Sequence, residues 1–164
     1  MVLLALGWLL ADQGSKWLVQ SHLKLHESQT TPGDWLLWTH VHNRGGAFGL
    51  FPGASLLFLG TGVGVIAVLL WTLPRTRSLD WASAVAYGLI MGGALGNLLD
   101  RLRLGYVVDF IDLNFRPLVT WPVFNVADIG ISTGIGLLIL TSIWPSRSPR
   151  PAPESSSTHT ESSE

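Results

Sequence analysis

Long apolar segments constrain this sequence more than any other feature. A helix that crosses a lipid bilayer needs about 20 consecutive, mostly apolar residues. The segments that approach this length are residues 2–19, 54–73, 81–99 and 123–144. The two middle segments carry no charge, the last carries only Asp128, and the first is interrupted by Asp12 and Lys16. We therefore predict an all-α membrane protein with four transmembrane helices.

Composition supports a bilayer as the main solvent and excludes several classes of protein. Only 13% of the residues are charged, against roughly a quarter in soluble proteins. The chain has eight tryptophans, a residue that is enriched at membrane–water interfaces. A net charge of −1 without a basic block argues against nucleic acid as a partner. Because the chain has no cysteine, disulfides and thiol catalysis are excluded.

The segments between and after the spans differ in character. Residues 22–51 are too long for a tight turn, and within them residues 35–41 favour a strand followed by a Gly45-Gly46 turn. We expect a small extracytoplasmic β-sheet element there. Residues 145–164 are rich in Pro and Ser and predict a disordered cytoplasmic tail. Residues 1–144 then form the membrane domain.

Basic residues indicate the orientation. Cytoplasmic loops of membrane proteins are enriched in Lys and Arg. The short second connection carries Arg75 and Arg77, and the tail carries Arg147 and Arg150. The longer connections on the other side also carry basic residues, so a raw count does not decide the topology. The density of charge in the short loop favours both termini in the cytoplasm.

With this topology, the aspartates near the spans all fall on the extracytoplasmic side. They are Asp12, Asp100, Asp109, Asp112 and Asp128. Ionisable groups at membrane depth are costly unless paired or hydrated, so each is a functional candidate. Their convergence indicates a site near one membrane surface rather than at the midplane.

Asp109 and Asp128 both lie in hydrophobic surroundings. Two carboxylates brought close together cannot both ionise, so the pair can share one proton. The ionised member can then take a proton from water while the protonated member donates to a scissile carbonyl. Two plainer roles stay open at this point: Asp128 as a helix N-cap, and Asp109 as a loop carboxylate or cap.

Other classes of function are also open. Buried carboxylates serve proton- or ion-coupled transporters, although these predict charges near the midplane and an internal repeat. A structural or assembly role without an enzymatic site would tolerate Asn at both aspartates. Four histidines in the first long connection could bind zinc, but no H-E-x-x-H motif accompanies them. They are His22, His26, His40 and His42.

Five segments resemble the motif set of the lipoprotein signal peptidases, also called signal peptidase II. They are DQGSK (12–16), NRGGAFG (43–49), GGALGNLLDR (92–101), VVDF (107–110) and FNVAD (124–128). Each alone is weak, but the five occur in order across the four predicted spans. The resemblance implies an intramembrane aspartic endopeptidase that removes signal peptides from bacterial prolipoproteins. It would cut before a cysteine that carries a diacylglyceryl group.

The resemblance also implies a location and a set of partners. The chain would lie in the bacterial cytoplasmic (inner) membrane, with its active site near the extracytoplasmic face. Its partners would be lipid-modified prolipoproteins and membrane lipid. We expect a monomer that uses no metal and no other cofactor.

By resemblance, Asp109 and Asp128 are the catalytic dyad, and only the motif match prefers Asp109 to Asp112. The residues implied to bind substrate or shape the site are Asn43, Gly45, Phe48, Asn97, Arg101 and Asn125. Asp12 and Lys16 are implied to give structural support, and their i, i+4 spacing lets them pair on a helix.

Plainer alternatives remain for some of these positions. Arg101 could simply satisfy the carbonyls at a helix end. The segment that begins at Asn43 could be a hairpin turn.

Overall fold

The computed structural model describes residues 1–45, 55–73, 80–115, 118–119 and 121–143. The described residues form four helices: α1 (Val2–His22), α2 (Ser55–Thr72), α3 (Trp81–Leu104) and α4 (Val126–Ile143). They also form three strands: β1 (Ser28–Thr30), β2 (Leu36–Asn43) and β3 (Val107–Leu113). The predicted tail, residues 145–164, lies outside the described residues.

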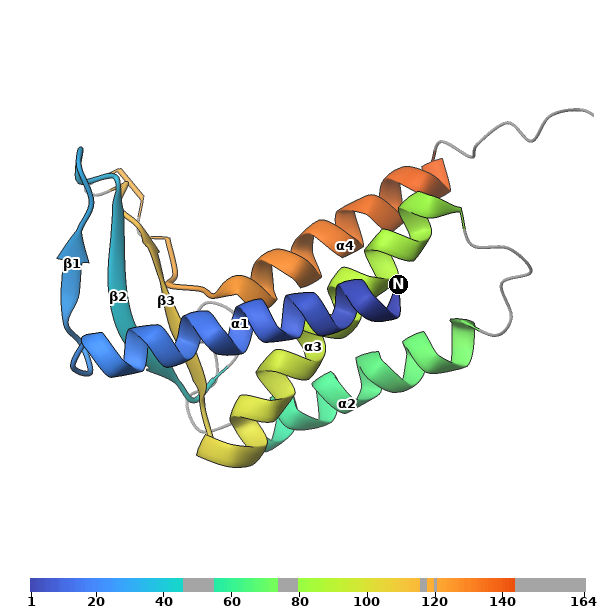
Figure 1. Cartoon of the computed structure of the whole chain (residues 1–164), viewed down its shortest axis with the longest axis horizontal. Helices are drawn as coiled ribbons and strands as arrows, with labels where there is room; N and C mark the ends of the chain where they lie inside the picture. The colour runs from blue at the N-terminus through green and yellow to red at the C-terminus, as the bar shows by residue number, and fades with distance from the viewer. Residues whose placement is uncertain (46–54, 74–79, 116–117, 120, 144–164) are drawn as a thin grey trace, which may run out of the picture.

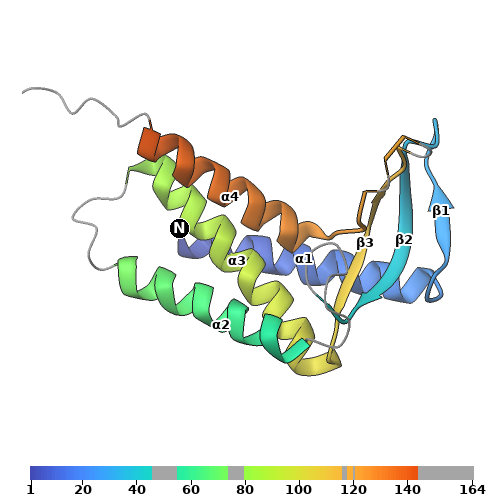
Figure 2. The ribbon, with the colours of Figure 1, turned by 180° about the vertical axis from the view of Figure 1, so that it is seen from behind.

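Helix α3 is the centre of the structure, because it packs against α1, α2 and α4. The sheet stands at one end of the helices (Figure 1). The N-terminus lies at the opposite end, together with the end of α2, the start of α3 and the end of α4 (Figure 1). The same arrangement is seen from behind in Figure 2. Every helix therefore has one end near the sheet and one end far from it.

The helices expose many large apolar side chains and bury several polar ones. Leu3 is 85% exposed on α1, Leu56 82% on α2 and Ile143 74% on α4, whereas Asp12 and Lys16 are buried. Large apolar faces of this kind need a partner other than water. Among the described residues, α3 and α4 are long and apolar enough to cross a membrane, and α2 is apolar over Leu56–Thr72.

Glycines let α3 and α4 approach closely. A Cβ added at Gly93 of α3 would collide with the backbone oxygen of Ala127, at the start of α4. A Cβ added at Gly134 of α4 would lie 2.8 Å from the backbone oxygen of Ala86 on α3. Small residues at such contacts let helix backbones pack directly, which is a main source of helix association in membranes.

The sheet is antiparallel, in the order β1-β2-β3. Strand β2 covers most of the segment that the sequence predicted, residues 35–41, and extends it to Asn43. The sequence did not predict β3, which comes from the long connection after the third apolar segment. Val41 is the register partner of Asp109. The sheet thus connects the first long loop to the strand that carries a predicted catalytic residue.

Two helix boundaries differ from the apolar segments in ways that matter for the site. Helix α3 continues past residue 99 to Leu104, where Gly105 takes a left-handed conformation with φ 79° and donates its N–H to Arg101 O. This is a common helix C-terminus. Asp100 and Arg101 are therefore helical residues rather than loop residues. Helix α4 begins only at Val126.

Gly134→Ala should destabilise the protein because its new methyl group would collide with α3. Overpacking of this kind costs about 1–3 kcal/mol. Gly136 of the same helix is a matched control, because apart from its chain neighbours and its own helix backbone no atom of the described residues lies within 4 Å of a Cβ placed there. Thermal unfolding in detergent should give a lower midpoint for Gly134→Ala and an almost unchanged one for Gly136→Ala. Equal midpoints for the two variants would contradict the close α3–α4 contact.

Candidate active site

A cavity of about 940 Å³ lies where the sheet meets α3 and α4. Asp109 of β3 and Asp128 of α4 both line it. Asn43 at the end of β2 and Asn97 and Arg101 of α3 line it as well. Segments that are distant in the sequence therefore contribute to one site.

Asp109 is buried, with 2% of its surface exposed, and it accepts two amide hydrogen bonds. Asn43 Nδ2 donates to Oδ2 over 2.8 Å, and Asn125 Nδ2 donates to Oδ1 over 2.6 Å. Burial, and next the negative charge of Asp128, raise the pKa of Asp109 to about 7, although the two amide bonds and Lys16 oppose the shift. A carboxyl group with this pKa can exchange a proton near neutral pH.

Asp128 is the third residue of α4 and pairs with Asn125 just before the helix. The Asp128 N–H donates to Asn125 Oδ1 over 3.0 Å, and the Asn125 N–H donates to Asp128 Oδ2 over 3.2 Å. This reciprocal arrangement is a capping box in which Asn125 is the N-cap. The alternative that Asp128 is itself the N-cap is therefore wrong. Its other oxygen, Oδ1, accepts from Asn97 Nδ2 over 2.8 Å and so takes part in the site.

Asn125 connects the two aspartates. It is fully buried, and its side chain bonds to Asp109 while its backbone and side chain bond to Asp128. Its Nδ2 also lies 3.2 Å from Asn97 Oδ1. One amide residue therefore fixes the position of each carboxyl group relative to the other.

Lys16 lies behind the aspartates, with 1% of its surface exposed. Its ammonium group contacts Asp12 Oδ2 at 2.8 Å, Asp100 Oδ2 at 2.9 Å and Asn97 Oδ1 at 3.0 Å. An ammonium group has three N–H donors, so these acceptors account for all of them. Asp12 and Lys16 face each other as their spacing predicted, and Asp12 Oδ1 also accepts from the Ala127 N–H at the start of α4.

Arg101 connects α3 to the end of β2. Its Nη1 donates to Asn97 O over 3.3 Å, which is the helix-end contact that its position allowed. Its Nη2 donates to Gly45 O over 3.4 Å, and the Gly45 N–H donates to Asn43 Oδ1 over 2.9 Å. The guanidinium group thus contacts Gly45, just after the strand that carries Asn43. Phe48, the remaining predicted site residue, lies outside the described residues.

The structure separates Asp109 from Asp112. The side chains of residues three apart in a strand point to opposite faces. Asp112 Oδ2 accepts from Thr39 Oγ1 over 3.1 Å, and Asp112 is not among the residues that line the cavity. Of Asp109 and Asp112, it is Asp109 that lines the cavity together with Asp128.

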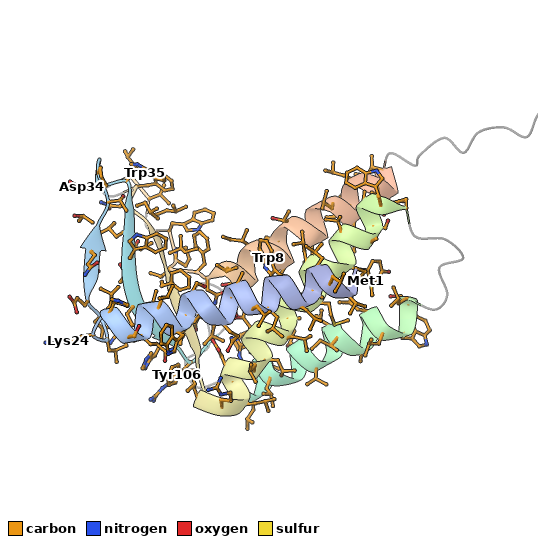
Figure 3. The ribbon with its side chains drawn as sticks, viewed as in Figure 1. Met1, Trp8, Lys24, Asp34, Trp35 and Tyr106 are labelled. Carbon is orange, nitrogen blue, oxygen red and sulfur yellow. The ribbon has the colours of Figure 1, made fainter. Side chains whose placement is uncertain are left out.

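His22 ends α1, whereas His40 and His42 lie on β2, where His42 also lines the cavity. The ring of His42 stacks on Tyr106 at 3.8 Å and meets the ring of His40 edge-on at 5.0 Å. Figure 3 shows Tyr106 near the end of α3. Within the described ranges, no three His, Asp or Glu side chains are grouped as a metal site would need.

Two residues of the site were not assigned a role from the sequence. Asp100 is buried and accepts hydrogen bonds from Gln13 Nε2 at 3.0 Å and from the Val108 N–H at 3.1 Å. Gln13 also donates to Asp12 over 3.1 Å. Both residues lie inside matched segments of the sequence, which was the available signal. Their partners depend on how α1 packs against α3, which the sequence does not reveal.

Comparison with known proteins identifies related chains. Residues 4–144 match the family model described as signal peptidase (SPase) II. The lipoprotein signal peptidase of Halothermothrix orenii is 46% identical over 132 residues, which cover 80% of this chain and 87% of that protein. The lipoprotein signal peptidase of Moorella thermoacetica is 42% identical over 147 residues, which cover 88% and 93%.

The fold is also similar to that of solved structures. A bacterial membrane enzyme solved by the in meso method at 2.3 Å resolution superposes with a TM-score of 0.79 and 30% identity. The superposition covers 87% of this chain and 86% of that one. A second, solved at 1.9 Å, gives a TM-score of 0.78 and 29% identity over 88% of this chain and 92% of that one.

Proposed function

The chain belongs to the signal peptidase II family, and we propose that Asp109 and Asp128 are the catalytic pair with which it removes signal peptides from prolipoproteins. One observation carries the assignment of the pair: two carboxyl groups from different elements line the same cavity and are joined through Asn125. Asp112, the nearest alternative in the sequence, does not line it.

The proposed chemistry follows from one shared proton. Burial and the charge of Asp128 favour the protonated form of Asp109 up to about pH 7. The ionised carboxylate of the pair removes a proton from a water molecule as the water oxygen attacks the scissile carbonyl carbon. The protonated carboxyl group donates its proton to the carbonyl oxygen. When the C–N bond breaks, the first carboxyl group gives the proton it took from water to the leaving amine. A hydroxyl of the tetrahedral intermediate returns a proton to the second carboxylate as the C=O bond forms again, which restores the shared proton.

The amide side chains keep this pair in place. Asn43 and Asn125 donate to Asp109, and Asn97 donates to Asp128. Each carboxyl group is therefore fixed before substrate arrives, and such preorganisation is a main source of catalytic power. Arg101 supplies a positive charge at the cavity wall and holds Gly45. We assign these residues to substrate binding and to shaping the site.

The rest of the cavity suits an apolar, extended substrate. Apolar side chains of α4 and of the segment before it line the wall beside the aspartates, and they include Ile129, Ile131 and Phe124. We propose that the peptide enters between the sheet and the helices and that cleavage occurs before the diacylglyceryl-modified cysteine. The lipid chains would remain in the membrane. Both aspartates come from one chain, so we propose that a monomer is active.

We further propose that all four helices cross the bacterial inner membrane. Helices α2 and α4 have 18 residues each, about 27 Å at 1.5 Å per residue, close to the thickness of a bilayer core. Trp71 and Trp81 are exposed at the end of the bundle away from the sheet, as interfacial residues are. The Arg-bearing second connection joins α2 and α3 at that end. Both termini would then be cytoplasmic and the site extracytoplasmic.

Asp109→Asn and Asp128→Asn should each abolish most cleavage, because Asn cannot carry the shared proton or remove one from water. General acid–base catalysis contributes about 100- to 10,000-fold, so kcat should fall at least about 100-fold. The assay uses purified protein in liposomes with a prolipoprotein whose cysteine carries diacylglycerol, and mass spectrometry identifies the cut.

Asp112→Asn is the matched control for this experiment, because it is a buried aspartate on the same strand that does not line the cavity. It should retain most of the wild-type rate. More than about a tenth of that rate in either dyad variant would reject the assignment. No cleavage by folded wild-type protein would reject the peptidase function itself.

The rate should also depend on pH in a defined direction. The pKa of Asp109 is raised, so the pair holds its shared proton below about pH 7 and loses it as the pH rises through that value. The protonated form is the one that donates to the carbonyl, so kcat/KM should fall on the alkaline side with an apparent pKa of about 7. A kcat/KM that stays level to about pH 9 would contradict the shared proton.

A further inference from the structure

We propose that Asp100 is a positioning residue that fixes the backbone of β3 next to Asp109 and connects it to the buried Lys16. The proposal rests on the function proposed above, because it assigns a role in placing the same catalytic pair. The carboxylate of Asp100 is buried, with 4% of the residue exposed, and does not line the cavity. It therefore acts through its contacts rather than on the substrate.

The contacts of Asp100 join three elements. Its Oδ2 accepts the N–H of Val108, the residue before Asp109, over 3.1 Å, and contacts Lys16 Nζ at 2.9 Å. Its Oδ1 accepts from Gln13 Nε2 over 3.0 Å. Helix α3 is thereby joined to α1 on one side and to the catalytic strand on the other.

The outer edge of β3 shows why the contact with Val108 matters. Strand β2 pairs along one edge of β3, so every second N–H of β3 points away from the sheet. On this outer edge, the Val108 N–H bonds to Asp100, and the Phe110 N–H bonds to Phe124 O over 2.9 Å. These two bonds lie on either side of Asp109. Val108 is fully buried. Loss of the Asp100 acceptor would therefore leave the Val108 N–H without a hydrogen-bond partner and destabilise this position of the strand.

Lys16 connects this arrangement to the other aspartate. The same ammonium group that contacts Asp100 donates to Asn97 Oδ1, which turns the Asn97 amide nitrogen toward Asp128. A lysine can only donate, so it fixes which end of the Asn97 amide faces it. One buried cation therefore reaches Asp109 through Asp100 and Asp128 through Asn97.

Two substitutions separate the two roles of Asp100. Asp100→Ala removes both the acceptor for Val108 and the negative charge beside Lys16. Asp100→Asn has the same shape and keeps an oxygen for Val108, but removes the charge. The titratable and charged groups around the pair are Asp12 and Lys16 on α1, Asp100 and Arg101 on α3, His42 on β2 and Arg44 directly after β2. Asp112→Asn is the control for loss of a buried carboxylate.

Cleavage of the lipid-modified prolipoprotein is measured for each folded variant as kcat, KM and the pH dependence of kcat/KM. Asp100→Ala should lower kcat about 100-fold, as a small misplacement of a catalytic group does, with KM within about 3-fold of the wild-type value. In Asp100→Asn, the alkaline limb should move to lower pH, because loss of a nearby negative charge favours ionisation of the pair. Asp112→Asn should leave kcat and the limb unchanged.

A purely structural role of Asp100 would not move the pH profile of kcat/KM. The position of the alkaline limb in Asp100→Asn therefore tests the positioning role even if Asp100→Ala fails to fold. An Asp100→Asn limb at the wild-type pH would overturn the proposal, as would folded Asp100→Ala with kcat within about 3-fold of wild type. If Asp109→Asn is inactive while the Asp100 variants behave like wild type, only the positioning role fails. If Asp109→Asn is active, the proposed function itself fails.

Discussion

The rest of this structure depends on the placement of the buried ammonium group of Lys16. The ammonium group of Lys16 is almost completely buried and has to satisfy three N–H donors without water. Its acceptors come from α1 and α3, and through Asp12 and Asp100 the network extends to the first turn of α4 and to β3. Removing one partner of a buried ion pair costs about 3–5 kcal/mol. The strand that carries Asp109 and the helix that carries Asp128 are therefore both connected to the ammonium group of Lys16, through Asp100 and Asp12.

Such a network needs helices that approach closely and exclude water. Gly96 of α3 lies directly against the Asp12 carboxylate, and any larger side chain would displace it. The apolar side chains that line the core of a soluble protein lie here on the outside, as on Leu3 and Leu56. Glycines and polar groups share the interior with a few apolar side chains such as Ile90 and Phe110. Because a poor dielectric surrounds the two aspartates, the pair keeps a proton that exposed carboxylates would lose.

The helices and the pairing of the two aspartates could be predicted from the sequence. Strand β3 and the contacts of Asp100 could not, and the reasons are physical. The apolar segments located the helices, and the motif resemblance placed Asp109 and Asp128 together and set Asp112 aside. Strand β3 was not predicted, because its partners on both edges, β2 and Phe124, come from other parts of the chain. The contacts of Asp100 with Gln13 and Val108 depend on helix packing and on a helix that continues beyond its apolar segment.

Infrared difference spectroscopy can directly detect one proton shared by two buried carboxyl groups. The C=O stretching band of a neutral carboxylic acid is compared between wild type and Asp109→Asn as the pH is raised. We expect a band from one neutral carboxyl group that persists below about pH 7, disappears above it and is missing in Asp109→Asn. If the neutral-acid band of the wild-type protein vanishes completely near pH 4, as for ordinary carboxylates, both aspartates are ionised above that pH and share no proton.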